Sequence, residues 1–140
     1  SPASFKDYGY SAQEIKIISH ARLMEYPRAR LIKSPEKSDI YYLYERQGKI
    51  MKIKIPSPAV FNSYSDNSWD DVVKVSQIDI NNYPSVKLVK VIGGVQIYYL
   101  EGNTKRYVSE ASFINNKFNR DDVMEISQKH FDSYQTGSPM

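Results

Sequence analysis

The stretch from Ser57 to Pro84 reads SPAVFNSYSDNSWDDVVKVSQIDINNYP and decides the fold, because shortened versions of it occur once before and once after it. The three versions begin at Ser1, Ser57 and Ser109, and a second serine follows 18, 19 and 18 positions later. A tyrosine follows each first serine by 25, 26 and 25 positions. Landmarks that keep their register in this way indicate internal repeats, so we predict a tandem-repeat protein.

A second motif lies between these versions. The segment at residues 31–33 (LIK) is followed by residues 40–43 (IYYL), and residues 88–90 (LVK) are followed by residues 97–100 (IYYL), with the same step of nine positions. Because these motifs are rich in residues that favour strands, each unit is predicted to have a strand-rich head and a helix-rich tail.

The two motifs together divide the chain. Residues 1–30 form a partial repeat that has only the helical tail, whereas residues 31–86 and 87–140 are full repeats. We interpret the chain as a segment cut from a longer array. A unit of about fifty residues buries little surface alone, so we expect neighbouring units to share a core.

Serine caps organise the predicted tail of the middle unit. Ser57, followed by proline, is expected to begin a helix over residues 58–64, and Ser68 to begin a helical turn in a capping box. Residues 72–75 are rich in β-branched side chains and are predicted to be extended. Ser76 is expected to cap a third helix over residues 77–82.

The heads are predicted to be antiparallel meanders. Residues 87–92 and 95–100 flank Gly93-Gly94, a dipeptide that favours a two-residue hairpin, and residues 105–108 supply a third strand. In the other head, residues 49–55 alternate apolar and cationic side chains, as a half-buried strand does. The predicted fold class is therefore α+β, with tandem repeats that each consist of a three-stranded antiparallel meander followed by short helices.

Composition excludes several classes of protein. The net charge is +3, which is too small to require a polyanionic partner. There is no cysteine, so disulfides, thiolate catalysis and cysteine-based zinc sites are excluded. No apolar run reaches the roughly 18 residues of a membrane span, and we expect neither a span nor a cofactor.

The sequence contains no recognisable catalytic motif, and we expect a protein that is not an enzyme. His20 and His130 stand at different places in their repeats, which favours surface histidines over a metal or acid–base site. Asp66, Asp70 and Asp71 could bind calcium through oxygen ligands. Asp70 and Asp71 also suit a helix N-terminus, where negative charge is favourable, so we expect no metal site.

Basic residues in and just before the head of the middle unit, together with its tyrosines, give a possible nucleic-acid interface. Its cations are Arg28, Arg30, Lys33, Lys49, Lys52 and Lys54, close in sequence to Tyr41, Tyr42 and Tyr44. The competing interpretation is a solvated cationic sheet face that protects an edge strand, and we prefer it.

Trp69 and Asp66 are the residues of the tail without a shared structural role. The positions equivalent to Trp69 hold Ala12 and Arg120, so a ring that only one unit carries is a candidate contact residue, or packs against a neighbouring unit. The candidate binding residues are therefore Trp69, Asp66, Tyr44, Lys49, Lys52 and Lys54.

The pattern Ser-x-Ala-x-Phe, then Trp-Asp-Asp-Val-Val-x-Val-Ser, then Tyr-Pro resembles tandem repeats of about fifty residues in secreted or surface-attached bacterial proteins. The resemblance implies an extracellular or cell-surface location and an accessory role. We therefore expect a non-catalytic module for cell-envelope attachment or protein self-assembly, with envelope material or further copies as partners. The alternatives are a carbohydrate-binding module for cell-wall glycans and, less favoured, nucleic-acid binding through the basic sheet face.

Overall fold

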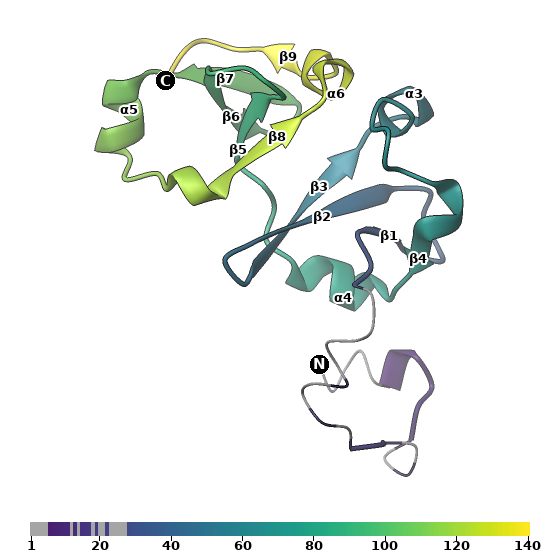
Figure 1. Cartoon of the computed structure of the whole chain (residues 1–140). Coiled ribbons are helices and arrows are strands. Elements are labelled where there is room, and N and C mark those ends of the chain that lie inside the picture. Colours follow the sequence, from purple (N-terminus) through teal and green to yellow (C-terminus); the bar gives the residue numbers. More distant parts are fainter. Residues whose placement is uncertain (1–5, 12, 14, 18, 20–21, 23–27) are drawn as a thin grey trace.

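The computed structural model describes residues 6–11, 13, 15–17, 19, 22 and 28–140. Residues 28–140 form a mixed α+β structure with two sheets and four short α-helices (Figure 1). We call residues 28–86 the first half and residues 87–140 the second half, since each contains one sheet. Ser1, Tyr26 and His20, on which part of the sequence interpretation depends, lie outside the described residues.

The first sheet has the strand order β3-β2-β1-β4. Strands β1 (Leu31–Lys33), β2 (Ile40–Arg46) and β3 (Lys49–Ile55) form antiparallel pairs in chain order, and β3 has the predicted bounds. The alternation in β3 sends Met51, Ile53 and Ile55 into the core, where each is at most 6% exposed.

The first sheet has one strand more than the sequence predicted. The extended segment after Asp71 forms β4 (Val72–Lys74), which pairs in parallel with β1, so that Ile32 lies opposite Val73. A parallel pair joins segments that are far apart in sequence, and no local pattern marks such a pairing. The predicted three-stranded meander is thus part of a four-stranded sheet.

The helical segments of the first half begin at the predicted serines. Ser57 caps α3 (Pro58–Phe61), Ser68 caps the 3₁₀ helix η2 (Trp69–Asp71), and Ser76 caps α4 (Gln77–Asn82). In each case the serine hydroxyl accepts a backbone N–H of the first turn, which is the usual N-cap bond. Helix α3 is shorter than predicted and ends at Phe61.

The second sheet has the order β8-β5-β6-β7-β9. Its antiparallel strands are β5 (Leu88–Val91), β6 (Ile97–Glu101) and β7 (Thr104–Val108). Strand β8 (Val123–Ile126) pairs in parallel with β5, and β9 (Gln135–Thr136) in parallel with β7.

The predicted two-residue hairpin at Gly93-Gly94 is wrong. Strands β5 and β6 pair only through Leu88 with Tyr99 and Val89 with Tyr98, which leaves a longer loop between them. Gly93 has φ +76°, whereas Gly94 is not among the positive-φ residues, so the backbone does not form the tight turn that requires both. Tertiary pairing of β5 with β8 extends β5 past the register of the hairpin.

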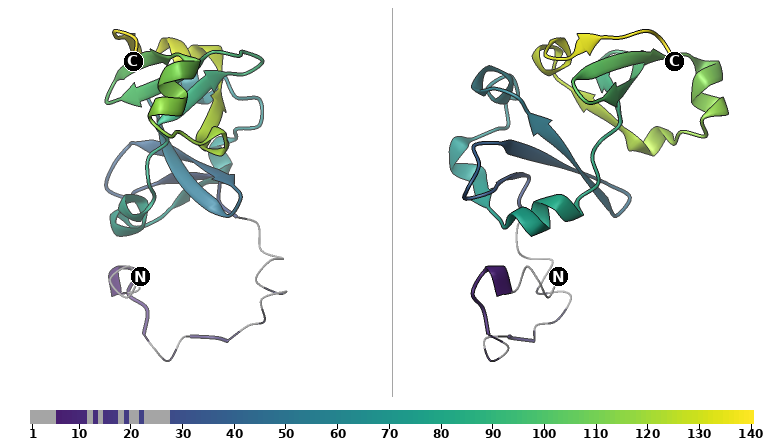
Figure 2. Two further views of the ribbon diagram at one scale, coloured as in Figure 1. Left: turned by 90° about the vertical axis from the view of Figure 1, so that its left-hand side faces the viewer. Right: turned by 180° about the vertical axis from the view of Figure 1, so that it is seen from behind.

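The second half has the same kinds of capped helix. Ser109 caps α5 (Glu110–Asn115), Asn119 caps the 3₁₀ helix η3 (Arg120–Asp122), and Ser127 caps α6 (Gln128–Asp132). The two halves lie next to each other (Figures 1 and 2), and α3 of the first half contacts α6 of the second.

Three clusters form the core. One lies within each half, and the largest joins the two halves. The joint cluster contains Met51, Ile53, Val86, Val89, Leu100, Met124 and Ile126. Because Met51 and Ile53 come from the first sheet and Val89 and Met124 from the second, the halves bury apolar surface against each other.

None of the helices in the described part of the chain has the length and apolar character that a bilayer crossing requires.

Candidate functional site

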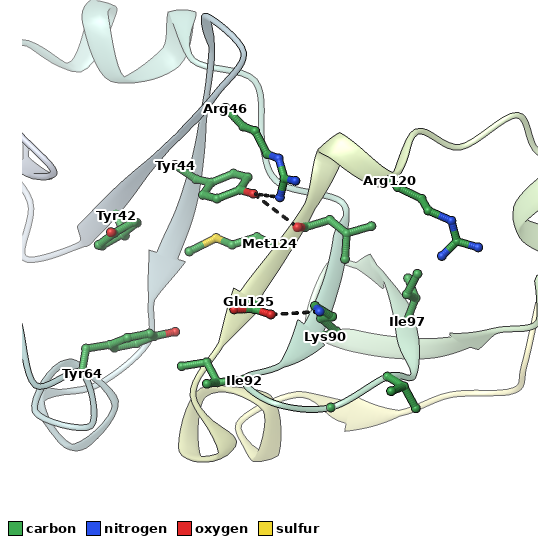
Figure 3. Close-up of a pocket in the computed structure, with 13 residues that line it drawn as sticks. Tyr42, Tyr44, Arg46, Tyr64, Lys90, Ile92, Ile97, Arg120, Met124 and Glu125 are labelled. Atoms are coloured by element: carbon green, nitrogen blue, oxygen red, sulfur yellow. Dashed lines mark hydrogen bonds and ion pairs between the residues drawn. The ribbon is translucent and has the colours of Figure 1, made fainter.

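The contact between the halves forms an open groove of about 940 Å³, which we call the junction groove (Figure 3). Tyr42, Tyr44 and Tyr64 line it from the first half, and Met124 and Glu125 from the second. The rings of Tyr42 and Tyr64 are stacked, with centroids 6.3 Å apart and planes at 18°. The junction groove is therefore largely aromatic on the side of the first half.

Tyr44 crosses the junction. Its hydroxyl donates to the carbonyl oxygen of Val123 at 3.3 Å and accepts from the guanidinium of Arg46 at 3.4 Å (Figure 3). The predicted contact residue Tyr44 thus binds the backbone of the second half, and its ring packs against the joint core cluster.

The hairpin between β2 and β3 reaches the acidic turn of the second half. Lys49 Nζ lies 2.8 Å from Asp122 Oδ1, Arg46 Nε lies 3.4 Å from Asp121 Oδ1, and Gln47 Nε2 donates to Asp121 Oδ2 at 3.1 Å. These side chains are a third to half exposed, so each ion pair contributes little to stability but fixes the register of the contact.

A buried histidine lies at the other end of the junction. The Tyr64 hydroxyl is 2.7 Å from His130 Nδ1 and accepts the backbone N–H of Ser127 at 3.3 Å. The phenol therefore has its proton free to donate to Nδ1, which places the imidazole proton on Nε2, 3.4 Å from the Tyr134 hydroxyl.

The sequence interpretation of His130 as a surface residue is wrong, because its side chain is fully buried. Burial lowers the pKa of His130 to about 4, against a smaller opposing effect of the Lys54 backbone. Burial likewise raises the pKa of Tyr134 to about 12 and raises that of Tyr64. All three groups are thus neutral near pH 7, and they form a structural network that links the halves.

A similar contact involves Tyr8, which lies before the first half. Its hydroxyl accepts the backbone N–H of Ser76 at 2.6 Å. Burial raises the pKa of Tyr8, with a smaller contribution from a side-chain hydrogen bond to Asp79. Asp79 stands three residues after the capping serine Ser76, and His130 stands three residues after the capping serine Ser127. Each tyrosine therefore contacts the N–H of a capping serine and the side chain three residues after that serine.

Two lysines are directed inward. Lys52 Nζ donates to the carbonyl oxygen of Ile80 in α4 at 2.6 Å, and Lys105 Nζ to that of Phe131 in α6 at 2.7 Å. Burial lowers the pKa of both ammonium groups. The structure therefore gives the predicted binding residue Lys52 a partner within its own half.

The remaining candidates lie apart from one another. Lys54 pairs with Asp39 at 2.9 Å. Trp69 stacks on Phe61 with centroids 3.9 Å apart, and its indole N–H donates to Asn62 Oδ1 at 3.3 Å, while half of the side chain stays exposed. Asp66 accepts a hydrogen bond from Ser65 and lines a separate hollow with Asp70 and Asp71. The candidates do not converge on one site.

The described part of the chain contains no group of three or more acidic, histidine or cysteine residues placed to hold a metal ion. Four of the six cations of the possible basic face have partners, because Arg28, Lys49 and Lys54 form ion pairs and Lys52 binds a carbonyl. This arrangement does not favour contacts with phosphate groups.

Tyr64, His130 and the Asp121-Asp122 pair were missed as contact residues. For Tyr64 the sequence did contain a signal, because Tyr64 follows Phe61 by three positions just as Tyr8 follows Phe5. A tyrosine at this shared position indicates a shared contact. The burial of His130 had no local signal, since it results from packing between segments more than sixty residues apart.

No protein-family model, curated protein or solved structure matches the chain.

Proposed function

We propose that the chain is a tandem-repeat module with units at residues 31–86 and 87–140 and a partial unit at residues 1–30. The order of strands and helices is the same in the two halves, apart from β9. The lysine contacts with Ile80 and Phe131 are equivalent, and the hydroxyls of Ser19, Ser76 and Ser127 each accept the N–H three residues later.

The observation that carries the proposal is the recurrence of the contact between units. Tyr64 binds the capping serine of the following tail, Ser127, and Tyr8 binds Ser76 in the same manner. A contact that recurs at the same position of each unit is what an open stack of units requires, since each unit contacts only its neighbours.

From this organisation we propose a non-catalytic, extracellular module that attaches to cell-envelope material or assembles with further copies. A stack of units gives a long, regular surface, and the halves offer aromatic and charged side chains along it. The junction groove and the exposed Tyr and Trp rings are the surfaces from which contacts with an envelope polymer are expected.

The test is co-sedimentation of the purified chain with isolated bacterial cell wall, together with light scattering over a range of concentrations. We expect saturable sedimentation with the wall, or a mass that rises with concentration. Heat-unfolded chain and an unrelated protein of similar charge serve as controls. A chain that stays monomeric and remains in the supernatant contradicts both forms of the proposal.

A second candidate is binding of cell-wall glycan at Trp69. One face of the indole packs on Phe61, the side chain is 51% exposed, and a hollow of about 290 Å³ beside it is lined by Ser38 and Asp39. An aromatic face next to hydroxyl and carboxylate groups suits the apolar and polar sides of a sugar ring.

Because Trp69 is the only tryptophan, its fluorescence reports this site directly. Titration with soluble wall glycan fragments should give a saturable change, and Trp69→Leu should abolish binding measured by calorimetry. A linear or absent change in fluorescence, with no calorimetric heat, removes this candidate.

A further inference from the structure

The two halves have equivalent apolar faces, and that of the first half is covered at Ile32 in β1, which is 1% exposed, but not at the edge strand β4. In the second half, Val89 and Met124 lie opposite each other in β5 and β8, and both are buried against the first half. The equivalent pair in the first half is Ile32 and Val73. Met124 is 3% exposed, whereas Val73 is 44% exposed, so the first half has an incompletely covered apolar face at β4.

The acidic residues beside this face lack the cations that their equivalents have. Asp121 and Asp122 pair with the hairpin residues Arg46 and Lys49. Asp70 and Asp71 occupy the same positions in η2, are exposed, and form no ion pair within the described part of the chain. Arg28 and Arg30 line the same hollow but form no ion pair with Asp70 or Asp71, so the first half has the acidic turn of the contact without the cationic hairpin.

A hollow of about 520 Å³ lies at this place. Asp66, Asp70, Asp71 and Val73 line it on the side of η2 and β4, and the segment from Arg28 to Leu31 lines it on the other side. We call Asp66, Asp70, Asp71 and Val73 the acceptor face. Tyr8 binds Ser76 as Tyr64 binds Ser127 in the second half, so one of the contacts of a preceding unit is present beside the acceptor face.

We propose that the acceptor face binds the three-stranded head of a further repeat unit that carries a cationic hairpin like that of residues 46–49. In the bound state a hairpin lysine would pair with Asp71 as Lys49 pairs with Asp122, and apolar side chains like Met51 and Ile53 would cover Val73. This inference rests on the repeat organisation proposed above, and it identifies the partner of one face.

The second half cannot supply an equivalent head. The hairpin between β6 and β7 is shorter than that between β2 and β3, because its last pair, Glu101 and Thr104, corresponds to Tyr44 and Met51. The second half therefore has no equivalent of the cationic tip at Arg46 and Lys49. Arg106 stands opposite Tyr99, where the first half has Ile53 opposite Tyr42. Burial of an arginine without a partner is costly, and association of identical chains through this face should therefore be much weaker.

The experiment places a head directly before the full chain. One variant carries a second copy of residues 28–56 directly before Ser1. This head then precedes the tail that begins at Ser1, as residues 28–56 precede the tail that begins at Ser57 in the native chain. The matched control carries residues 85–108 ahead of Ser1, which reproduces the order before Ser109. Each fusion is combined with Val73→Cys, which adds the sole thiol because the chain contains no cysteine.

We expect the first fusion to slow alkylation of the thiol about tenfold, while the control fusion alkylates at nearly the rate of the unextended Val73→Cys chain. Carbodiimide treatment should join the Lys49 peptide to the Asp70-Asp71 peptide in the monomeric first fusion. The native link from Lys49 to Asp122 in the same sample shows that the fold is intact, and Asp70→Asn with Asp71→Asn should remove only the new link.

Equal alkylation rates in the two fusions, or a missing new link while the native link forms, would overturn the inference. These outcomes are independent of the wall-binding test. Wall binding without docking of the head refutes only the inference about the acceptor face, and docking without wall binding or self-association refutes only the attachment function.

Discussion

Strands β2 and β3 of the first half pair in the same way as strands β6 and β7 of the second half, with Ile53 and Arg106 at equivalent positions. The side chains on the face that carries these two residues nevertheless differ in chemistry. Ile53 is buried at the junction between the halves, and the equivalent Arg106 lies on the surface and pairs with Glu101. The same sheet geometry thus serves as core or as surface according to its side chains. The contact between the two halves is therefore decided by a few positions on one face.

The largest expected effect on stability comes from placing an arginine, the residue found at position 106, at the equivalent buried position 53. Ile53→Arg should lower the free energy of unfolding by roughly 3–5 kcal/mol, because the guanidinium would be buried without a partner. Urea unfolding of the full chain measures this change. The reciprocal Arg106→Ile should change stability by only about 1 kcal/mol, since it removes a partly exposed ion pair with Glu101 and one hydrogen bond to the Ser138 carbonyl. Equal costs for both substitutions would refute the difference between the faces.

The second effect is the pH dependence given by His130. Its pKa is about 4 in the folded chain, against an ordinary value near 6.5, so the unfolded chain binds more protons between these values. Stability should therefore fall as the pH decreases from about 6.5 to 4, by about 3 kcal/mol in total.

Unfolding of the parent, His130→Gln and His20→Gln chains across this pH range isolates the contribution of His130. His130→Gln should remove most of the slope, and His20→Gln should retain it. A slope that survives in His130→Gln would show that the junction histidine titrates normally.

A smaller effect is expected from the inward lysines. Lys105 is 6% exposed and lies 3.8 Å from the centroid of the Phe131 ring, so Lys105→Met leaves the Phe131 carbonyl without its donor. We expect a loss of about 1–2 kcal/mol in thermal or urea unfolding. Lys52→Met is the matched variant and should cost less, because Lys52 is more exposed. The reverse ranking would show that the cost does not depend on the burial of the lysine.

The smallest effect is expected at the hairpin ion pair. Lys49→Ala and Asp122→Asn should each cost about 0.5 kcal/mol, because both side chains are partly exposed. A double-mutant cycle should give a coupling energy of similar size that decreases in high salt. A coupling energy near zero in low salt would show that the pair does not fix the junction.

Local features of the fold were predictable from the sequence, and non-local ones were not. Ser57 and Ser76 were identified as caps because N-caps depend on a few neighbouring residues, and α4 and β3 have their predicted bounds. The parallel strand β4 and the longer loop at Gly93 depend on pairing between distant segments. Local patterns do not encode such pairing.

The candidate site was predicted in part. Tyr44 and Lys49 lie at the junction, whereas Lys52 binds its own half and Trp69 packs on Phe61. The alternation of β3 showed which side of the strand is polar, but it could not show that α4 places a carbonyl over Lys52. A side chain's partner depends on the packing of elements, which only the tertiary structure specifies.

The central claim is that the two halves are stacked units that share one core. Urea unfolding followed by Trp69 fluorescence for the first half, and by the methyl NMR signals of Val108 for the second, tests it most directly. We predict coincident transitions that shift together in Ile53→Arg. Two separate transitions, of which only the Trp69 transition moves in Ile53→Arg, would contradict the account.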